Sequence, residues 1–175
     1  ESNTAVYGMF DFEKGALRGN FGLRYISTDV TGEGYKLDGT PVTPGDIGQN
    51  AGWGTAKTTQ SSSYNDVLPS LNAILALDKN TNLRFSAAQA ITRPNFDNMF
   101  LATQAGFNDT VKNNESVTLG SVGLKPMKST QFDLGVEYYY GKGNLVSANY
   151  FHKSIDNFIT STTTPNQKIG AVSPD

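Results

Sequence analysis

The chain of 175 residues has no cysteine, a single histidine and no long apolar run. The lack of cysteine excludes a disulfide framework and any site that binds a metal through thiolates. A membrane-spanning helix needs ~18 or more consecutive apolar residues, whereas the most apolar short stretch, 71–77, is already interrupted by Asn72. The 14 Lys and Arg nearly balance the 16 Asp and Glu, which gives no reason to expect nucleic acid as a partner.

What the chain does contain is aromatic residues and glycine, with few stretches that favour a helix. There are 8 Tyr, 10 Phe and 18 Gly, a composition that favours an all-β fold. Apolar and polar residues alternate with a period of two, which is the pattern of strands with one apolar face. The six predicted strands are 5–12, 17–28, 64–77, 83–92, 130–140 and 145–155.

One of these strands has a competing interpretation. Residues 70–77 follow Pro69, and proline is common at the first position of a helix. The alternation of the segment continues upstream of this proline, so a strand is favoured.

The connections between the predicted strands alternate between short and long. Segments 13–15, 78–82 and 141–144 are short, whereas 29–63 and 95–129 are long and rich in Gly, Thr, Ser, Asn and Pro. Loops of compact soluble domains have a median of about 4–6 residues, but transmembrane β-barrels combine short periplasmic turns with long extracellular loops. The predicted strands also approach or exceed the ~9–11 residues that cross a bilayer. The sequence therefore predicts an antiparallel up-and-down meander that is part of a transmembrane β-barrel.

The fifth predicted strand shows how the two faces of such a meander would differ. Phe132, Leu134 and Val136 share one face, and Asp133 and Glu137 lie on the other. We expect the apolar face to contact lipid and the polar face to line the lumen. A soluble sandwich would show the same alternation, so the loop pattern and the strand lengths carry this interpretation.

Several motifs, taken in order, resemble the barrel of TonB-dependent outer-membrane receptors. They are GALRGNFGLRYISTD (15–29), YNDVLPSLNAILAL (64–77), LRFSAAQAITRPNF (83–96), LKPMKSTQFDLGVEYYY (124–140) and SANYFHKSIDNFI (147–159). The similarity is strongest to the large receptors described from Xanthomonas and Caulobacter.

The resemblance implies an outer-membrane barrel of about 22 strands, plugged by an N-terminal domain. Such receptors bind a scarce nutrient and import it with energy delivered by TonB. Six strands cannot close a barrel, since ~8 is the smallest number found. We therefore expect residues 1–175 to be a fragment of the barrel domain, without the plug domain, the TonB box and the terminal strands. Its expected partners are membrane lipid and a nutrient, with TonB reached only through the absent plug.

Five residues are candidates for the lumen wall or for ligand contact. Arg18, Arg24, Asp133 and Glu137 would line the lumen, unless they bind the plug or one another. Trp53 stands between two glycines in a predicted loop, where it would stack on a flat ligand or anchor the loop. The resemblance favours a carbohydrate ligand and leaves a ferric siderophore as the main alternative.

No enzyme, cofactor or metal site is predicted. His152, Ser154 and Asp156 share a strand face, but neither a nucleophile turn nor an oxyanion site accompanies them. Segment 78–82 begins like a calcium loop, yet Leu83 stands at the glycine position and Gln89 at the position of the bidentate carboxylate. A soluble secreted β-domain that acts as an adhesin or sugar-binding module remains the alternative function.

Overall fold

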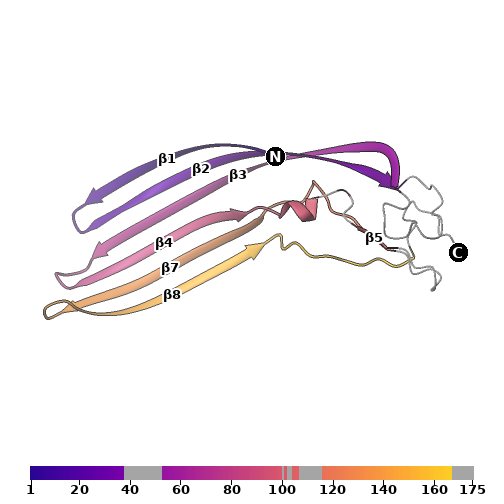
Figure 1. Cartoon of the computed structure of the whole chain (residues 1–175). Helices are drawn as coiled ribbons and strands as arrows, with labels where there is room; N and C mark the ends of the chain where they lie inside the picture. Colours follow the sequence, from indigo (N-terminus) through magenta and orange to yellow (C-terminus); the bar gives the residue numbers. More distant parts are fainter. Residues whose placement is uncertain (38–52, 100, 102–103, 107–115, 167–175) are drawn as a thin grey trace.

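The structure, a computed structural model, describes residues 1–37, 53–99, 101, 104–106 and 116–166. Its main element is a six-stranded antiparallel sheet with the order β1-β2-β3-β4-β7-β8 (Figure 1). The strands are β1 (Ser2–Lys14), β2 (Leu17–Leu37), β3 (Trp53–Ala76), β4 (Thr81–Thr92), β7 (Met127–Tyr140) and β8 (Asn144–Asp156). The predicted all-β meander is therefore confirmed.

The connection between β4 and β7 contains three small elements. A 3-10 helix, η1 (Phe96–Met99), follows β4, and β5 (Gln104–Gly106) pairs with β6 (Ser116–Thr118) in a separate two-stranded sheet. No helix in the described part of the chain is long and apolar enough to cross a membrane. Residues 70–76 pair with β2 on one side and with β4 on the other, so the strand interpretation of this segment is correct.

The predicted loop over residues 29–63 is the main error of the sequence analysis. Strand β2 continues to Leu37 and β3 begins at Trp53, and the two pair from Val30↔Ser62 to Tyr35↔Lys57. This stretch is rich in Ser and Thr and lacks the apolar alternation from which strands were predicted. Backbone hydrogen bonds hold a ladder whatever the side-chain polarity, so the strands extend well beyond the apolar pattern.

The three short turns lie together at one end of the sheet (Figure 1). Gly15, Gly141 and Gly143 adopt positive φ angles of 61°, 58° and 88°, which glycine reaches without steric cost. In the β3–β4 turn, the backbone N–H of Asn80 donates a 2.7 Å hydrogen bond to Asp78 Oδ1. This bond lowers the pKa of Asp78, so the carboxylate supports the turn above its ordinary pKa. The support is lost as the pH falls through the lowered value.

The register of the sheet separates an apolar face from a polar one. Residues that lie directly opposite one another form rows across all six strands. One row reads Phe10, Phe21, Leu71, Ala87, Phe132 and His152, and the row beside it reads Asp11, Asn20, Asn72, Ser86, Asp133 and Phe151. The first row lies on the apolar face and the second on the opposite, polar face.

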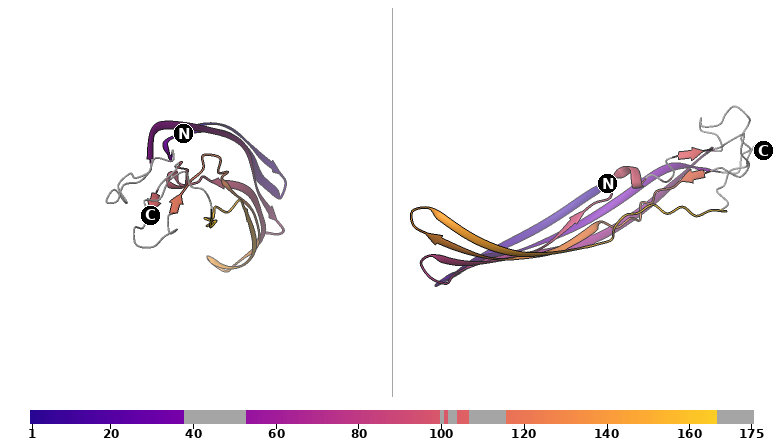
Figure 2. Two further views of the ribbon diagram at one scale, coloured as in Figure 1. Left: turned by 90° about the vertical axis from the view of Figure 1, so that its right-hand side faces the viewer. Right: turned by 90° about the horizontal axis from the view of Figure 1, so that it is seen from below.

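The sheet is strongly curved, and the polar face is its inner side. Seen end-on, it forms an arc with η1, β5 and β6 within the hollow (Figure 2). Ile26 and Val30 share the polar face by register, and Val30 packs on Met99 of η1 and on Val122. We call the polar face the concave face and the apolar face the convex face. The predicted placement is confirmed for Leu23, Phe132, Leu134 and Val136 on the convex face and for Arg24, Gln131, Asp133 and Glu137 on the concave face.

The side chains of the convex face are largely exposed. Phe10 is 67% exposed, Leu134 44% and Tyr150 60%. These values are high for large apolar residues in the middle of a six-stranded sheet, because nothing in the described part of the chain covers this side. A contiguous apolar surface of this kind marks an interaction site or contact with a membrane.

Polarity changes faces where β2 and β3 extend past the rest of the sheet. On the convex face the apolar residues end with the pair Tyr25↔Val67, and the pairs above it are polar, from Ser27↔Asn65 to Glu33↔Thr59. On the concave face, Ile26 and Val30 are instead buried, each 5% exposed. We call this upper part of β2 and β3, residues 26–37 and 53–66, the extended hairpin.

Candidate functional site

Four of the five candidate residues lie on the concave face, but they do not form one cluster. Arg18 lies opposite Glu13 and Ile74, and Arg24 lies opposite Tyr7 and Leu68. Asp133 and Glu137 lie on β7, two strands beyond β3. They therefore line a wall rather than build a compact site.

The expected loop position of Trp53 is wrong. Trp53 begins β3 and pairs with Leu37, next to an irregularity in the register between Tyr35 and Leu37. The ladder of the extended hairpin reaches this residue because no breaking residue interrupts it. Its place is at the far end of the hairpin from the short turns.

Glu137 is part of a small charged group near the short turns. Its Oε1 lies 2.7 Å from Nε of Arg84, and its Oε2 accepts a 2.9 Å hydrogen bond from the hydroxyl of Tyr139. Arg84 was not among the candidates, although its position on the polar face of its strand was visible. Only the register, which sets Glu137 opposite Asn82 and Arg84 opposite Gly135, shows that the two side chains meet diagonally across β4 and β7.

We expect the Arg84–Glu137 pair to contribute modestly to stability. The Arg84 side chain is 46% exposed, and exposed ion pairs couple by about 0.2–1 kcal/mol. A double-mutant cycle with Arg84→Met and Glu137→Gln, measured by urea unfolding of the full receptor, should give a coupling in this range that shrinks at high salt. A coupling above about 3 kcal/mol would instead indicate a desolvated pair.

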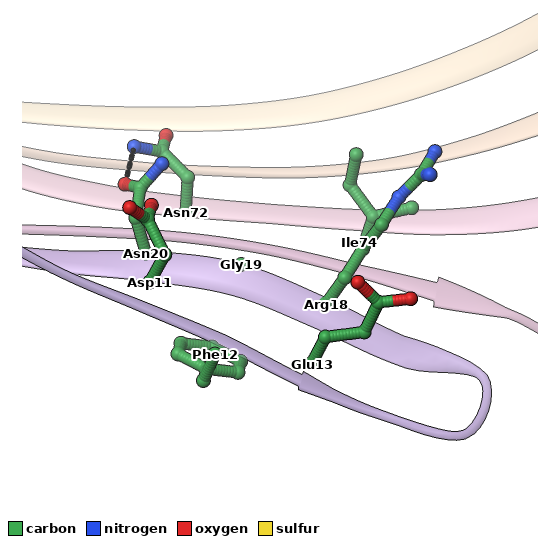
Figure 3. A pocket seen from close by; sticks show the side chains of 8 residues that line it. All are labelled: Asp11, Phe12, Glu13, Arg18, Gly19, Asn20, Asn72 and Ile74. Carbon is green, nitrogen blue, oxygen red and sulfur yellow. Dashed lines mark hydrogen bonds between the residues drawn. The ribbon is translucent and has the colours of Figure 1, made fainter.

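Other polar groups of the concave face also bind one another. Asn72 Nδ2 donates to Asn20 Oδ1 at 2.9 Å, and Ser86 Oγ donates to Asp133 Oδ2 at 3.2 Å. The first pair borders an open hollow near the β1–β2 turn, where the side chain of Phe12 points to the other side of the sheet (Figure 3). The hollow is lined by Asp11, Phe12, Glu13, Arg18, Gly19, Asn20, Asn72 and Ile74.

At the opposite end, the β4–β7 connection is held on the concave side of the extended hairpin. Val30, Met99 and Val122 form a buried cluster with Tyr64, Leu101 and Leu124 around it. A Cβ atom on Gly32 would lie only 2.7 Å from Cγ1 of Val122, so this glycine permits the close contact.

Two ion pairs fix the ends of the same connection. Arg93 Nε lies 3.3 Å from Glu1 Oε1, and Lys128 Nζ lies 3.1 Å from Asp66 Oδ1. Both pairs join strands that are not neighbours in the sheet. The segments that flank η1 and precede β7 are therefore anchored at this end of the sheet.

The only histidine belongs to the convex face. The ring of His152 stacks on Phe132 with a centroid distance of 5.2 Å, and the register also sets the two residues opposite each other. Ser154 and Asp156 follow at alternate positions on the same face, opposite Thr130 and Lys128. The described residues include no group of three side chains placed to hold a metal ion.

Comparison with known protein families identifies the class of protein. Residues 1–172 match the family described as TonB dependent receptor-like, beta-barrel. The match covers almost the whole chain, and the chain belongs to this family.

Two solved structures share the fold. One is a double mutant of the Serratia marcescens hemophore receptor HasR in complex with its hemophore HasA and heme. It is 14% identical, with a TM-score of 0.57 over 98% of this chain and 28% of that chain. The other is the ferric enterobactin receptor PfeA, 16% identical, with a TM-score of 0.50 over 98% of this chain and 30% of that chain. The comparison with curated proteins found no match.

These comparisons support an outer-membrane receptor that acts in transport. The chain spans less than a third of either solved receptor. The narrower similarity to the Xanthomonas and Caulobacter receptors is not confirmed.

Proposed function

We propose that this chain is a section of the barrel wall of a TonB-dependent receptor that imports a scarce nutrient across the outer membrane. The convex face contacts lipid and the concave face lines the lumen. The observation that carries this proposal is the exposed apolar surface, which runs unbroken across the convex side of six strands. A soluble domain would cover such a surface with a second layer.

The outline of the apolar surface also fits a tilted barrel. On β2 the apolar residues end at Tyr25, four residues above Phe21, whereas on β7 they end at Phe132, which lies in the same row as Phe21. At ~3.3 Å per residue the limit drops by about 13 Å from β2 to β7. Three strand spacings of ~4.8 Å separate the two strands by about 14 Å. The limit therefore slants by about 40°, which matches the ~35–45° tilt of strands in outer-membrane barrels.

The change of polarity above Tyr25 sets the outer boundary of the membrane. Beyond it the convex face is polar, and the apolar residues turn inward against Met99 and Val122. The extended hairpin continues for twelve residues from Tyr25 to Leu37, or about 40 Å at ~3.3 Å per residue. Long connections belong to the extracellular side and short turns to the periplasmic side, so this hairpin projects outward.

The nutrient is a carbohydrate or a ferric siderophore, and the partners of the chain are membrane lipid and, through a plug domain, TonB. The solved neighbours support a metal-chelate class, since one holds heme with its hemophore and the other is named for ferric enterobactin. The sequence resemblance supports the carbohydrate class. Both ligand classes are compatible with a receptor of this architecture.

Single-cysteine spin labels test the lipid contact directly, because this chain has no cysteine of its own. In the full receptor, reconstituted in lipid vesicles, a label at Leu134→Cys should be relaxed mainly by oxygen, which concentrates in lipid. A label at the neighbouring Asp133→Cys should respond mainly to a water-soluble nickel chelate or to neither reagent. Equal oxygen accessibility at the two positions would overturn the proposed lipid exposure.

A further inference from the structure

One large aromatic side chain at the extracellular end has no structural role in the described contacts. Phe96, the first residue of η1, is 65% exposed. It follows β4 at the end of the sheet opposite the short turns, and η1 lies within the hollow of the sheet (Figures 1 and 2). The ring is therefore presented at the mouth of the lumen.

The short helix that carries this ring is well anchored. Met99, its last residue, is 6% exposed in the cluster with Val30 and Val122. The N–H of Asn98 donates to the carbonyl of Asn95 at 3.1 Å, and the N–H of Ser121 donates to the carbonyl of Asn98 at 3.0 Å. A side chain on a fixed platform loses less conformational entropy when it binds a ligand than one on a free loop.

The polar neighbours of the ring have free hydrogen-bonding capacity. Asn95, Asp97 and Asn98 are exposed, and their side chains form no hydrogen bond or ion pair with other described residues. An amide both donates and accepts hydrogen bonds, and a carboxylate accepts them from hydroxyl groups. The only charge in this stretch of four residues is the negative charge of Asp97, which disfavours an anionic chelate.

We propose that Phe96, together with Asn95, Asp97 and Asn98, contacts a neutral saccharide at the extracellular mouth. The ring stacks on the C–H face of a sugar, and the three polar side chains bind its hydroxyl groups. This inference rests on the proposed function and assigns to Phe96 the stacking role first considered for Trp53. It also selects one of the two nutrient classes.

The experiment uses the full receptor in detergent, first on an array of neutral oligosaccharides and then by calorimetry with the strongest ligand of that array. Phe96→Ala should weaken binding about tenfold or more, as expected for the loss of an aromatic anchor. Phe96→Trp should bind within about threefold of the natural receptor, because it keeps the stacking surface. Phe158→Ala is the matched control, since Phe158 is 66% exposed and lies after β8, away from η1; it should bind normally.

Two results would overturn the inference. A receptor that binds no saccharide of the array, whatever its affinity for ferric enterobactin, would remove the saccharide assignment. Saccharide binding that is unchanged in Phe96→Ala would remove the assigned site. Neither result would affect the lipid contact tested by the spin labels, so failure of this inference is distinguishable from failure of the transport function.

Discussion

Leu134→Arg in the full receptor is expected to lower the free energy of unfolding by about 2–4 kcal/mol, the cost of a cation near the bilayer midplane of an outer-membrane barrel. Leu134 is 44% exposed on the convex face, between Phe85 and Tyr150 of the neighbouring strands. It lies one alternate position from the middle of the apolar stretch of β7, which runs from Phe132 to Tyr140. The introduced guanidinium would therefore displace apolar contacts with lipid tails.

Gln131→Arg on the same strand is the matched control. Gln131 lies on the concave face, opposite Ala88 and Lys153, where the lumen admits water. Its effect should stay within about 1 kcal/mol, since substitutions on the lumen side are far less costly than those facing lipid. Urea unfolding in lipid vesicles measures both variants. Equal losses in the two variants would show that the convex face does not contact lipid.

The sequence predicted the central part of each strand and failed toward the extracellular end. Within the membrane, alternation is forced because one face meets lipid and the other meets polar groups, so Phe132, Leu134 and Val136 are recognisable by pattern alone. In the extended hairpin both faces of the ladder are largely polar, and backbone pairing rather than side-chain polarity keeps the strands together. Period-two hydrophobicity carries no signal there, and Trp53 was consequently placed in a loop.

The lumen wall was predictable only as separate residues. The polar positions of each strand could be identified, but a contact such as Arg84–Glu137 depends on the register between two strands. The 34 residues that connect β4 with β7 leave that register free in the sequence. The platform that holds Phe96 depends on a longer-range contact still, between η1 and the extended hairpin, and the burial of Met99 beneath Val122 has no local sequence signal.

Gly19→Ala is the second substitution with a large expected effect. A Cβ atom at this position would overlap the backbone oxygen of Asn72, and it would lie 2.6 Å from Cζ of Phe12 and 3.0 Å from Cα of Ala73. Two of these three neighbours are backbone atoms of β3, which cannot rotate away as a side chain can. Strands β2 and β3 would have to move apart at the point where they pair most closely. We expect a loss of about 1–3 kcal/mol, the usual cost of overpacking.

Gly8→Ala separates this steric effect from the general consequences of replacing a glycine in a strand. Gly8 belongs to the same convex face through its pairing with Leu23, and a Cβ atom there would meet nothing within 4 Å. Because alanine restricts the unfolded chain more than glycine does, this variant should be neutral or more stable by about 0.5–1 kcal/mol. Urea midpoints of the two variants in the full receptor give the comparison. If Gly19→Ala were as stable as Gly8→Ala, the close approach of β2 and β3 at Gly19 would not exist in the assembled barrel.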